Sequence, residues 1–101
     1  NQVYGQITIQ DIINRVCTAF SVTEEEIVGQ SRRKNIVEAR QVVAYLSRKV
    51  LDMSLSAVGL HLGGRDHTTI MHAQRKIENL IKKDQKFQRR VDIVYNELNL
   101  N

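Results

Sequence analysis

The sequence contains no proline and a single cysteine, and it has no long run of apolar residues. One cysteine, Cys17, excludes a disulfide within the chain and fits a reducing cytosol. No apolar run approaches the roughly 20 residues of a membrane span, and no signal-peptide pattern opens the chain. We therefore expect a cytoplasmic protein without a membrane span.

Catalytic and metal-binding patterns are also missing. No nucleophile–base pair or carboxylate pair is discernible, so we do not expect an enzyme. The histidines at 61, 67 and 72 lack the i, i+4 spacing that places two imidazoles on one helical face, so we expect no metal site. The 101 residues suit a single domain (1–101), and the start at Asn1 rather than methionine predicts a fragment of a longer chain.

The net charge of +4 is unevenly distributed along the chain. Residues 1–30 carry one basic and four acidic side chains, a net charge of −3. Residues 31–76 carry nine basic and three acidic side chains (+6), and residues 77–101 carry five and four (+1). A concentrated basic region is typical of proteins that bind a polyanion.

The most informative stretch is 54–80, which predicts two helices joined by a glycine turn. Apolar residues recur with helical spacing before Gly63 and Gly64, and again after Asp66, which is placed as an N-cap. This pattern predicts a helix-turn-helix, whose second helix can enter the DNA major groove. The first turn of that helix is crowded with side chains that can hydrogen-bond to base edges. We expect base contacts from Arg65, Asp66, His67, Thr68 and Thr69, with Arg65 on a base or an adjacent phosphate.

A basic loop and a long amphipathic helix precede this motif. The loop is residues 30–35, QSRRKN, and its arginines can reach the minor groove of A·T-rich DNA. The helix at 35–51 has Gln41 and Arg48 on the side opposite its apolar stripe, with Ala44 between them. We expect Ala44 to let a DNA backbone approach, while Gln41 and Arg48 bind phosphates.

Three further helices complete the fold prediction. Thr8 and Thr23 are expected to cap helices that reach Phe20 and the neighbourhood of Gly29, and residues 84–98 should form the last helix. The predicted fold is all-α, with about six helices around the helix-turn-helix (Trp-repressor-like).

Residues 64–73, GRDHTTIMHA, resemble the signature of the C-terminal DNA-binding domain of the bacterial chromosomal replication initiator family, DnaA. Residues 39–46, ARQVVAYL, resemble an upstream helix of the same domain, and Ser54–Leu55 also fit. The resemblance covers nearly the whole chain, more weakly before Ile27 and after Lys83.

The resemblance implies binding to double-stranded DNA at the DnaA box, consensus TTATCCACA, during initiation of chromosome replication. It implies a basic loop in the minor groove, where Arg32 aligns best with the inserting arginine, although the choice between Arg32 and Arg33 stays open. It also implies that Arg40 and Gln41 bind phosphates. With the residues suggested by their position in the sequence, the predicted phosphate-binding residues are Arg33, Lys34, Arg40, Gln41, Arg48 and Arg75.

The family's ATPase is a separate domain, which would hold ATP or ADP in the full-length protein. This chain has no Gly-x-x-x-x-Gly-Lys-Ser/Thr string, so we expect it to bind no ATP and no other cofactor. We expect the fragment to be monomeric, and the full-length protein to oligomerise on the origin in the nucleoid and to meet regulatory proteins. Two alternatives remain: a helix-turn-helix transcription regulator with another operator, and a protein-interaction module.

Overall fold

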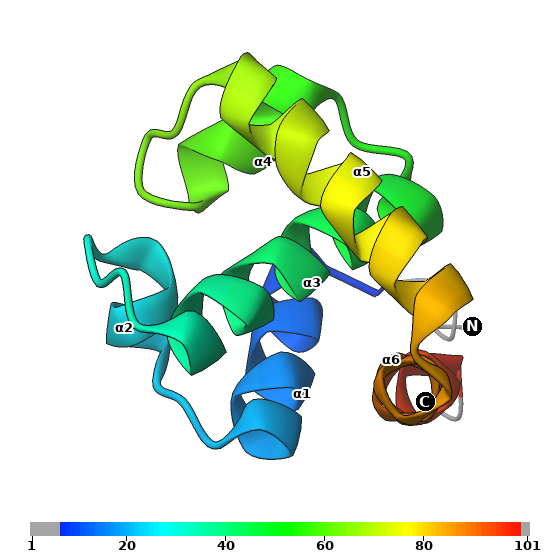
Figure 1. The fold of residues 1–101 in the computed structure, drawn as a ribbon. Helices are drawn as coiled ribbons and strands as arrows, with labels where there is room; N and C mark the ends of the chain where they lie inside the picture. Colours follow the sequence, from blue (N-terminus) through cyan, green and yellow to red (C-terminus); the bar gives the residue numbers. More distant parts are fainter. Residues whose placement is uncertain (1–6, 100–101) are drawn as a thin grey trace.

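The computed structural model describes residues 7–99, and the regular secondary structure in that range is entirely α-helical (Figure 1). Its helices are α1 (Ile9–Phe20), α2 (Glu24–Val28), α3 (Lys34–Leu51), α4 (Leu55–His61), α5 (His67–Lys83) and α6 (Gln85–Asn99). The prediction of an all-α fold with about six helices is confirmed. Within this range no helix is long and apolar enough to cross a membrane.

The first two helices begin at the predicted capping residues. The Thr8 hydroxyl accepts a hydrogen bond from the Asp11 N–H at 3.2 Å, and the Asp11 carboxylate accepts one from the Thr8 N–H at 2.9 Å. The same reciprocal pair links Thr23 and Glu26, at 3.1 and 2.9 Å. Each pair gives hydrogen-bond acceptors to two backbone N–H groups at the start of a helix. The local sequence is therefore enough to set both helix starts.

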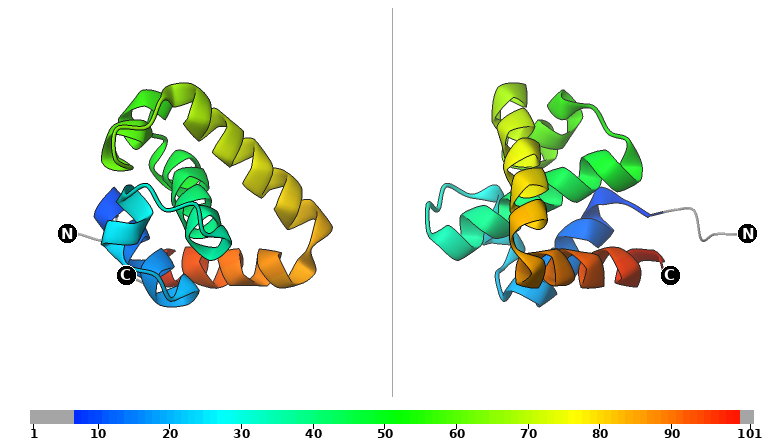
Figure 2. Two further views of the ribbon diagram at one scale, coloured as in Figure 1. Left: turned by 60° about the vertical axis from the view of Figure 1, so that its left-hand side comes forward. Right: turned by 45° about the vertical axis from the view of Figure 1, so that its right-hand side comes forward.

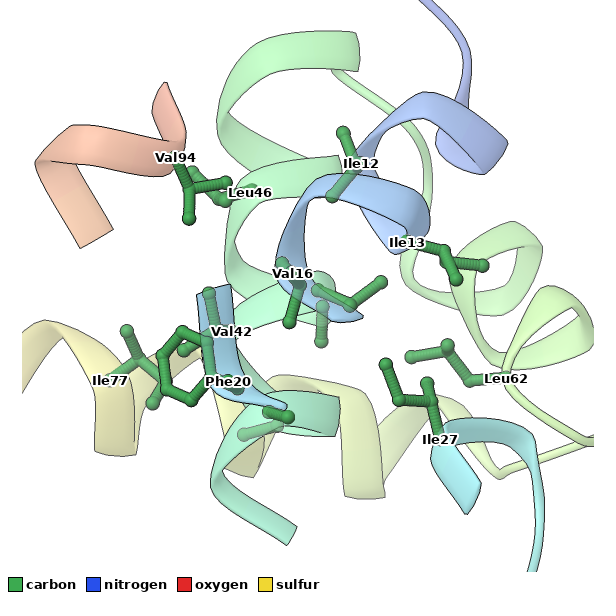
Figure 3. Close-up of a cluster of buried hydrophobic side chains, with 14 of the residues drawn as sticks. Ile12, Ile13, Val16, Phe20, Ile27, Val42, Leu46, Leu62, Ile77 and Val94 are labelled. Carbon is green, nitrogen blue, oxygen red and sulfur yellow. The ribbon is translucent and has the colours of Figure 1, made fainter. Parts of the chain in front are cut away.

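Helix α3 is the centre of the molecule and contacts α1, α2, α4 and α5 (Figure 1). Figure 3 shows Val42 and Leu46 of α3 in the same apolar cluster as Val16 of α1 and Val94 of α6. The buried apolar residues of α3 are Ile36, Ala39, Val42, Val43, Ala44 and Leu46.

The prediction that Ala44 faces outward is wrong. Ala44 is only 1% exposed, and it lines one cleft together with Ala73 of α5. Helix α3 is covered on several sides, so its buried surface is wider than one apolar stripe, and a small side chain here lets α5 pack closely.

Helices α5 and α6 meet at a corner, and α6 then runs back beneath the other helices (Figure 2). Asp84, between them, accepts a hydrogen bond from the Phe87 N–H at 3.1 Å. The Phe87 and Phe20 rings pack edge to face with centroids 6.3 Å apart, and the Arg90 guanidinium lies 4.0 Å from the Phe20 ring centre. These contacts hold α6 against α1 and leave the α4–α5 turn at the other end of α5.

Candidate nucleic-acid interface

The turn between α4 and α5 depends on glycine. Gly63 and Gly64 have φ angles of +80° and +77°, a region that favours glycine because it has no Cβ. The Gly59 carbonyl accepts hydrogen bonds from the N–H groups of Gly64 and Arg65, at 3.0 and 2.9 Å. A Cβ on Gly59 would overlap the Arg65 carbonyl oxygen, so α4 presents bare backbone to the turn. The arrangement is the predicted helix-turn-helix.

The first turn of α5 presents an exposed polar surface. Asp66 is the N-cap, and its carboxylate accepts a hydrogen bond from the Thr68 N–H at 3.0 Å. Hydrogen bonds with Thr68 hold the pKa of Asp66 below its ordinary value. His67 Nδ1 lies 3.5 Å from the other Asp66 carboxylate oxygen, and the side chains of His67, Thr68 and Thr69 are exposed. The structure therefore places these four predicted base-contacting residues together at one helix start.

The predicted basic loop (30–35) corresponds in the structure to residues 29–33, which connect α2 to α3 and are called the basic loop from this point. It lies on the same side of the molecule as the α4–α5 turn (left in Figure 1). Arg32 and Arg33 are exposed, and the Arg33 N–H donates to the Ser31 hydroxyl at 3.3 Å. Lys34, predicted to lie in the loop, is instead the first residue of α3 and is also exposed. Both DNA-reading elements expected from the sequence thus share one side of the domain.

Arg65 is half-buried, and its guanidinium reaches back from the α4–α5 turn to the end of α2. Its Nη1 donates to the Leu62 carbonyl at 2.6 Å and to the Val28 carbonyl at 3.4 Å, and its Nη2 donates to the Gly29 carbonyl. Burial lowers the pKa of Arg65 from its ordinary value. These donors are engaged with backbone carbonyls, and the contact of Arg65 with a base or an adjacent phosphate stays a prediction.

Arg40 is also enclosed within the domain. It is 8% exposed; its Nε donates to the Ile27 carbonyl at 2.6 Å, and its Nη2 donates to the carbonyls of Glu26 and Ser31 at 3.0 and 3.2 Å. Burial, and secondarily the nearby positive charge of Arg65, lowers the pKa of Arg40. Arg40 therefore has internal partners that the sequence did not indicate, and its phosphate contact stays a prediction.

Arg48 joins the end of α3 to the segment that follows it and to α5. Its Nε donates to the Gln74 side-chain oxygen at 3.2 Å, and its Nη1 donates to the Met53 carbonyl at 2.6 Å. The side chain is half-buried. Sequence position had grouped Arg48 with Gln41 as a phosphate-binding residue, but the structure gives it internal partners.

A cleft of about 290 Å³ lies between α3 and α5, next to the α4–α5 turn. Gln41 contributes from α3, and His72 and Lys76 contribute from α5. The Gln41 Oε1 is buried without a hydrogen-bond partner among the described residues. Arg75 is exposed but does not line this cleft. The sequence favours Arg75 as the phosphate-binding residue of this helix, and the cleft adds His72 and Lys76 as candidates beside Gln41.

Within residues 7–99, no three His, Cys, Asp or Glu side chains are grouped so that they could hold a metal ion. Cys17 is half-buried in α1, and burial, assisted by the charges of Glu24 and Glu26, raises the pKa of its thiol. A raised pKa disfavours the reactive thiolate, so Cys17 packs as a small core residue.

Fold and surface together define a helix-turn-helix DNA-binding domain. The family described as the helix-turn-helix of the bacterial dnaA protein matches residues 9–77. The chain belongs to this DnaA family, as its sequence signature suggested.

Its relatives carry the name chromosomal replication initiator protein DnaA. The chain is 40% identical to the protein of Chlorobaculum tepidum over 96 residues, covering 88% of this chain and 20% of that protein. It is 41% identical to the Streptococcus thermophilus protein over 92 residues, covering 91% and 20%. For Limosilactobacillus fermentum the identity is 44% over 82 residues, covering 81% and 19%. The chain therefore spans about a fifth of the length of these curated relatives.

Proposed function

We propose that this domain binds double-stranded DNA sequence-specifically and recognises the DnaA box of a bacterial replication origin. The observation that carries the proposal is an exposed α5 start together with an exposed arginine pair in the basic loop, with the α4–α5 turn and the loop on the same side of the domain (Figure 1). One element suits base edges in the major groove, and the other suits the negative potential of a narrow minor groove. The name of the relatives, chromosomal replication initiator protein DnaA, supports a role in replication initiation.

The proposed roles follow the exposure of each side chain. Asp66, His67, Thr68 and Thr69 read bases in the major groove, with the threonine methyl groups available to thymine methyls. Arg32 enters the minor groove, with Arg33 as its alternative. The proposed phosphate contacts are Arg33, Lys34, Gln41, His72, Arg75 and Lys76.

Gln41, His72 and Lys76 form a reasonable phosphate site because all three line the cleft between α3 and α5. A phosphate entering the cleft would accept hydrogen bonds from the Gln41 amide and from the two α5 side chains. Arg40, Arg48 and Arg65 stay predicted contacts, although their guanidinium groups already donate some of their N–H groups within the domain. Arg40 and Arg65 also line this cleft.

For the longer protein to which the domain would belong, we propose initiation of chromosome replication in the cytoplasm, on the nucleoid. In this proposal a separate domain binds ATP or ADP, several copies assemble on the origin, and regulatory proteins act on the assembly. The support is the relatives' shared name and their greater length.

The test is fluorescence anisotropy of the 101-residue chain with a duplex containing TTATCCACA and with a shuffled duplex, over a salt series. A preference of roughly a thousandfold or more is expected for specific recognition of the box. Equal and steeply salt-dependent binding to both duplexes would mean a different operator or none. Absence of binding to either would favour the protein-interaction module.

A further inference from the structure

We propose that Arg65 and Arg40 form a guanidinium clamp that fixes the basic loop relative to the helix-turn-helix turn. In this view the two arginines are positioning residues. They hold the two DNA-reading elements at one spacing before DNA is bound. The consequence for recognition rests on the proposed function, whereas the clamp itself is a property of the protein without DNA.

The first half of the clamp is the Arg65 side chain. It spans from the turn, where it holds the Leu62 carbonyl, to the end of α2 and the start of the basic loop, where it holds the Val28 and Gly29 carbonyls. The Val28 and Gly29 carbonyls lie 37 and 36 residues away from Arg65 along the chain. One side chain thus ties the two reading elements directly to each other.

The second half of the clamp comes from α3. Arg40 holds the Glu26 and Ile27 carbonyls at the end of α2 and the Ser31 carbonyl within the basic loop. Ser31 immediately precedes Arg32, and its hydroxyl also accepts the Arg33 N–H. The backbone on both sides of the proposed minor-groove arginine is therefore held, while the Arg32 side chain stays exposed.

The geometry explains why arginine is needed. The last carbonyls of a helix lack partners within the helix, and α2 ends among several such groups. A planar guanidinium offers five N–H donors in a fixed fork, so one side chain can hold carbonyls that point from different segments. A lysine ammonium keeps the charge but not this planar spread of donors.

The segments joined by the clamp are also in close backbone contact. A Cβ on Gly63 would overlap the Val28 carbonyl oxygen and would lie 2.9 Å from the Arg65 Nη1 atom. The turn therefore rests directly on the end of α2, with the guanidinium beside the contact. A change in either arginine should be felt in the loop, even though the loop and the turn are far apart in sequence.

The first experiment measures loop order without DNA, by ¹⁵N relaxation of the 101-residue chain. Arg65→Lys and, independently, Arg40→Lys should lower the backbone order of the basic loop, while melting curves verify that each variant remains folded. The matched control is Arg89→Lys on α6, an exposed arginine outside the clamp, which should leave the loop unchanged. Wild-type loop order in both folded clamp variants would overturn the proposal.

The second experiment is a double-mutant cycle on box binding with Arg32→Ala and Arg65→Lys. If Arg65 acts by placing the loop, Arg65→Lys should weaken binding about fivefold more in the wild-type background than in the Arg32→Ala background. Additive effects would contradict coupling through Arg32. A chain that binds no box at all would refute the proposed function, but the relaxation measurement would still decide whether the clamp exists.

Discussion

Arg32 and Arg33 are neighbours in the sequence, but they occupy different positions relative to the start of α3. Arg33 is the N-cap of α3 and its N–H donates to the Ser31 hydroxyl, whereas Arg32 lies within the loop before the cap. We therefore predict that Arg32→Ala abolishes the preference for A·T pairs at one end of the box, because a narrow A·T-rich minor groove attracts the inserted arginine. Arg33→Ala should weaken binding to all duplexes alike.

Anisotropy with duplexes in which the A·T pairs are exchanged for G·C pairs measures this preference. Each lost base discrimination should amount to about 1–3 kcal/mol. If Arg33→Ala removed the A·T preference and Arg32→Ala did not, the two assignments would have to be exchanged.

Asp66 gives a prediction about pH and stability. Its folded-state pKa is lowered, chiefly by the hydrogen bonds with Thr68, so the ionised carboxylate stabilises the fold at pH values above its ordinary pKa. This contribution is lost as the pH falls through the lowered pKa, where the carboxylate becomes protonated. Asp66→Asn keeps a capping oxygen but removes the ionisation.

Urea unfolding of the wild-type chain and Asp66→Asn, from roughly pH 7 to pH 2, measures the difference in free energy of unfolding. The stabilisation by the carboxylate should be present at neutral pH and should disappear towards the acid end. A difference that is constant with pH would show that the carboxylate charge adds nothing to the cap.

The exposed positions of His67 and Thr68 could be predicted, because a helix start and its apolar stripe follow from local sequence. The inward orientations of Arg40 and Arg65 could not. A long side chain turns toward whichever acceptors lie nearby, and the Gly29 carbonyl that receives Arg65 comes from 36 residues upstream. A basic residue in a DNA-binding signature is therefore ambiguous until its carbonyl neighbours are known.

The helix-turn-helix turn offers a matched pair of substitutions. Gly63 and Gly64 both have positive φ, but a Cβ on Gly63 would overlap the Val28 carbonyl whereas one on Gly64 would meet nothing within 4 Å. We predict that Gly64→Ala costs about 1–2 kcal/mol, the penalty of a left-handed residue with a Cβ. Gly63→Ala should cost at least about 1 kcal/mol more, because the turn must move off α2.

Urea unfolding of the two variants measures the comparison, and Gly64→Ala is the control for the backbone penalty. Equal destabilisation would mean that the turn and the end of α2 separate easily. That result would also weaken the case for a rigid spacing between the turn and the basic loop.

Helix positions were largely predictable because capping pairs and glycines are local signals: Thr8, Thr23 and Asp66 all cap the helices expected of them. The buried face of α3 was not fully predictable. Ala44 lies outside the strongest apolar stripe, yet α5 covers it. A helix that packs against several others needs more than one apolar face. A helical wheel drawn from the sequence does not show how many other helices will pack against it.

The charge along the chain separates into an acidic amino-terminal part and a basic middle part that contains the loop, α3 and the start of α5. Such an asymmetry orients a domain in the field of a polyanion before close contacts form. Basic side chains on α6, such as Arg89, add to the net charge but lie on a different element from the proposed contacts. The number of phosphates neutralised should therefore be smaller than the number of basic residues.

The salt dependence of binding measures how many basic side chains contact phosphates. Each phosphate contact releases condensed counterions, so removing one contact should reduce the slope of log K against log salt by about 1. We predict that reduction for Lys76→Ala, because Lys76 lines the cleft with Gln41 and His72. The loss of affinity should be similar for box and shuffled duplexes, since a phosphate contact carries no sequence information.

Arg89→Ala is the matched control, because it removes the same charge from α6 and should leave the slope unchanged. Equal reductions from both variants would mean that overall charge, rather than the cleft, determines the counterion release. A Lys76→Ala variant that changed base preference at constant slope would move Lys76 from the phosphate-binding residues to the base-reading ones.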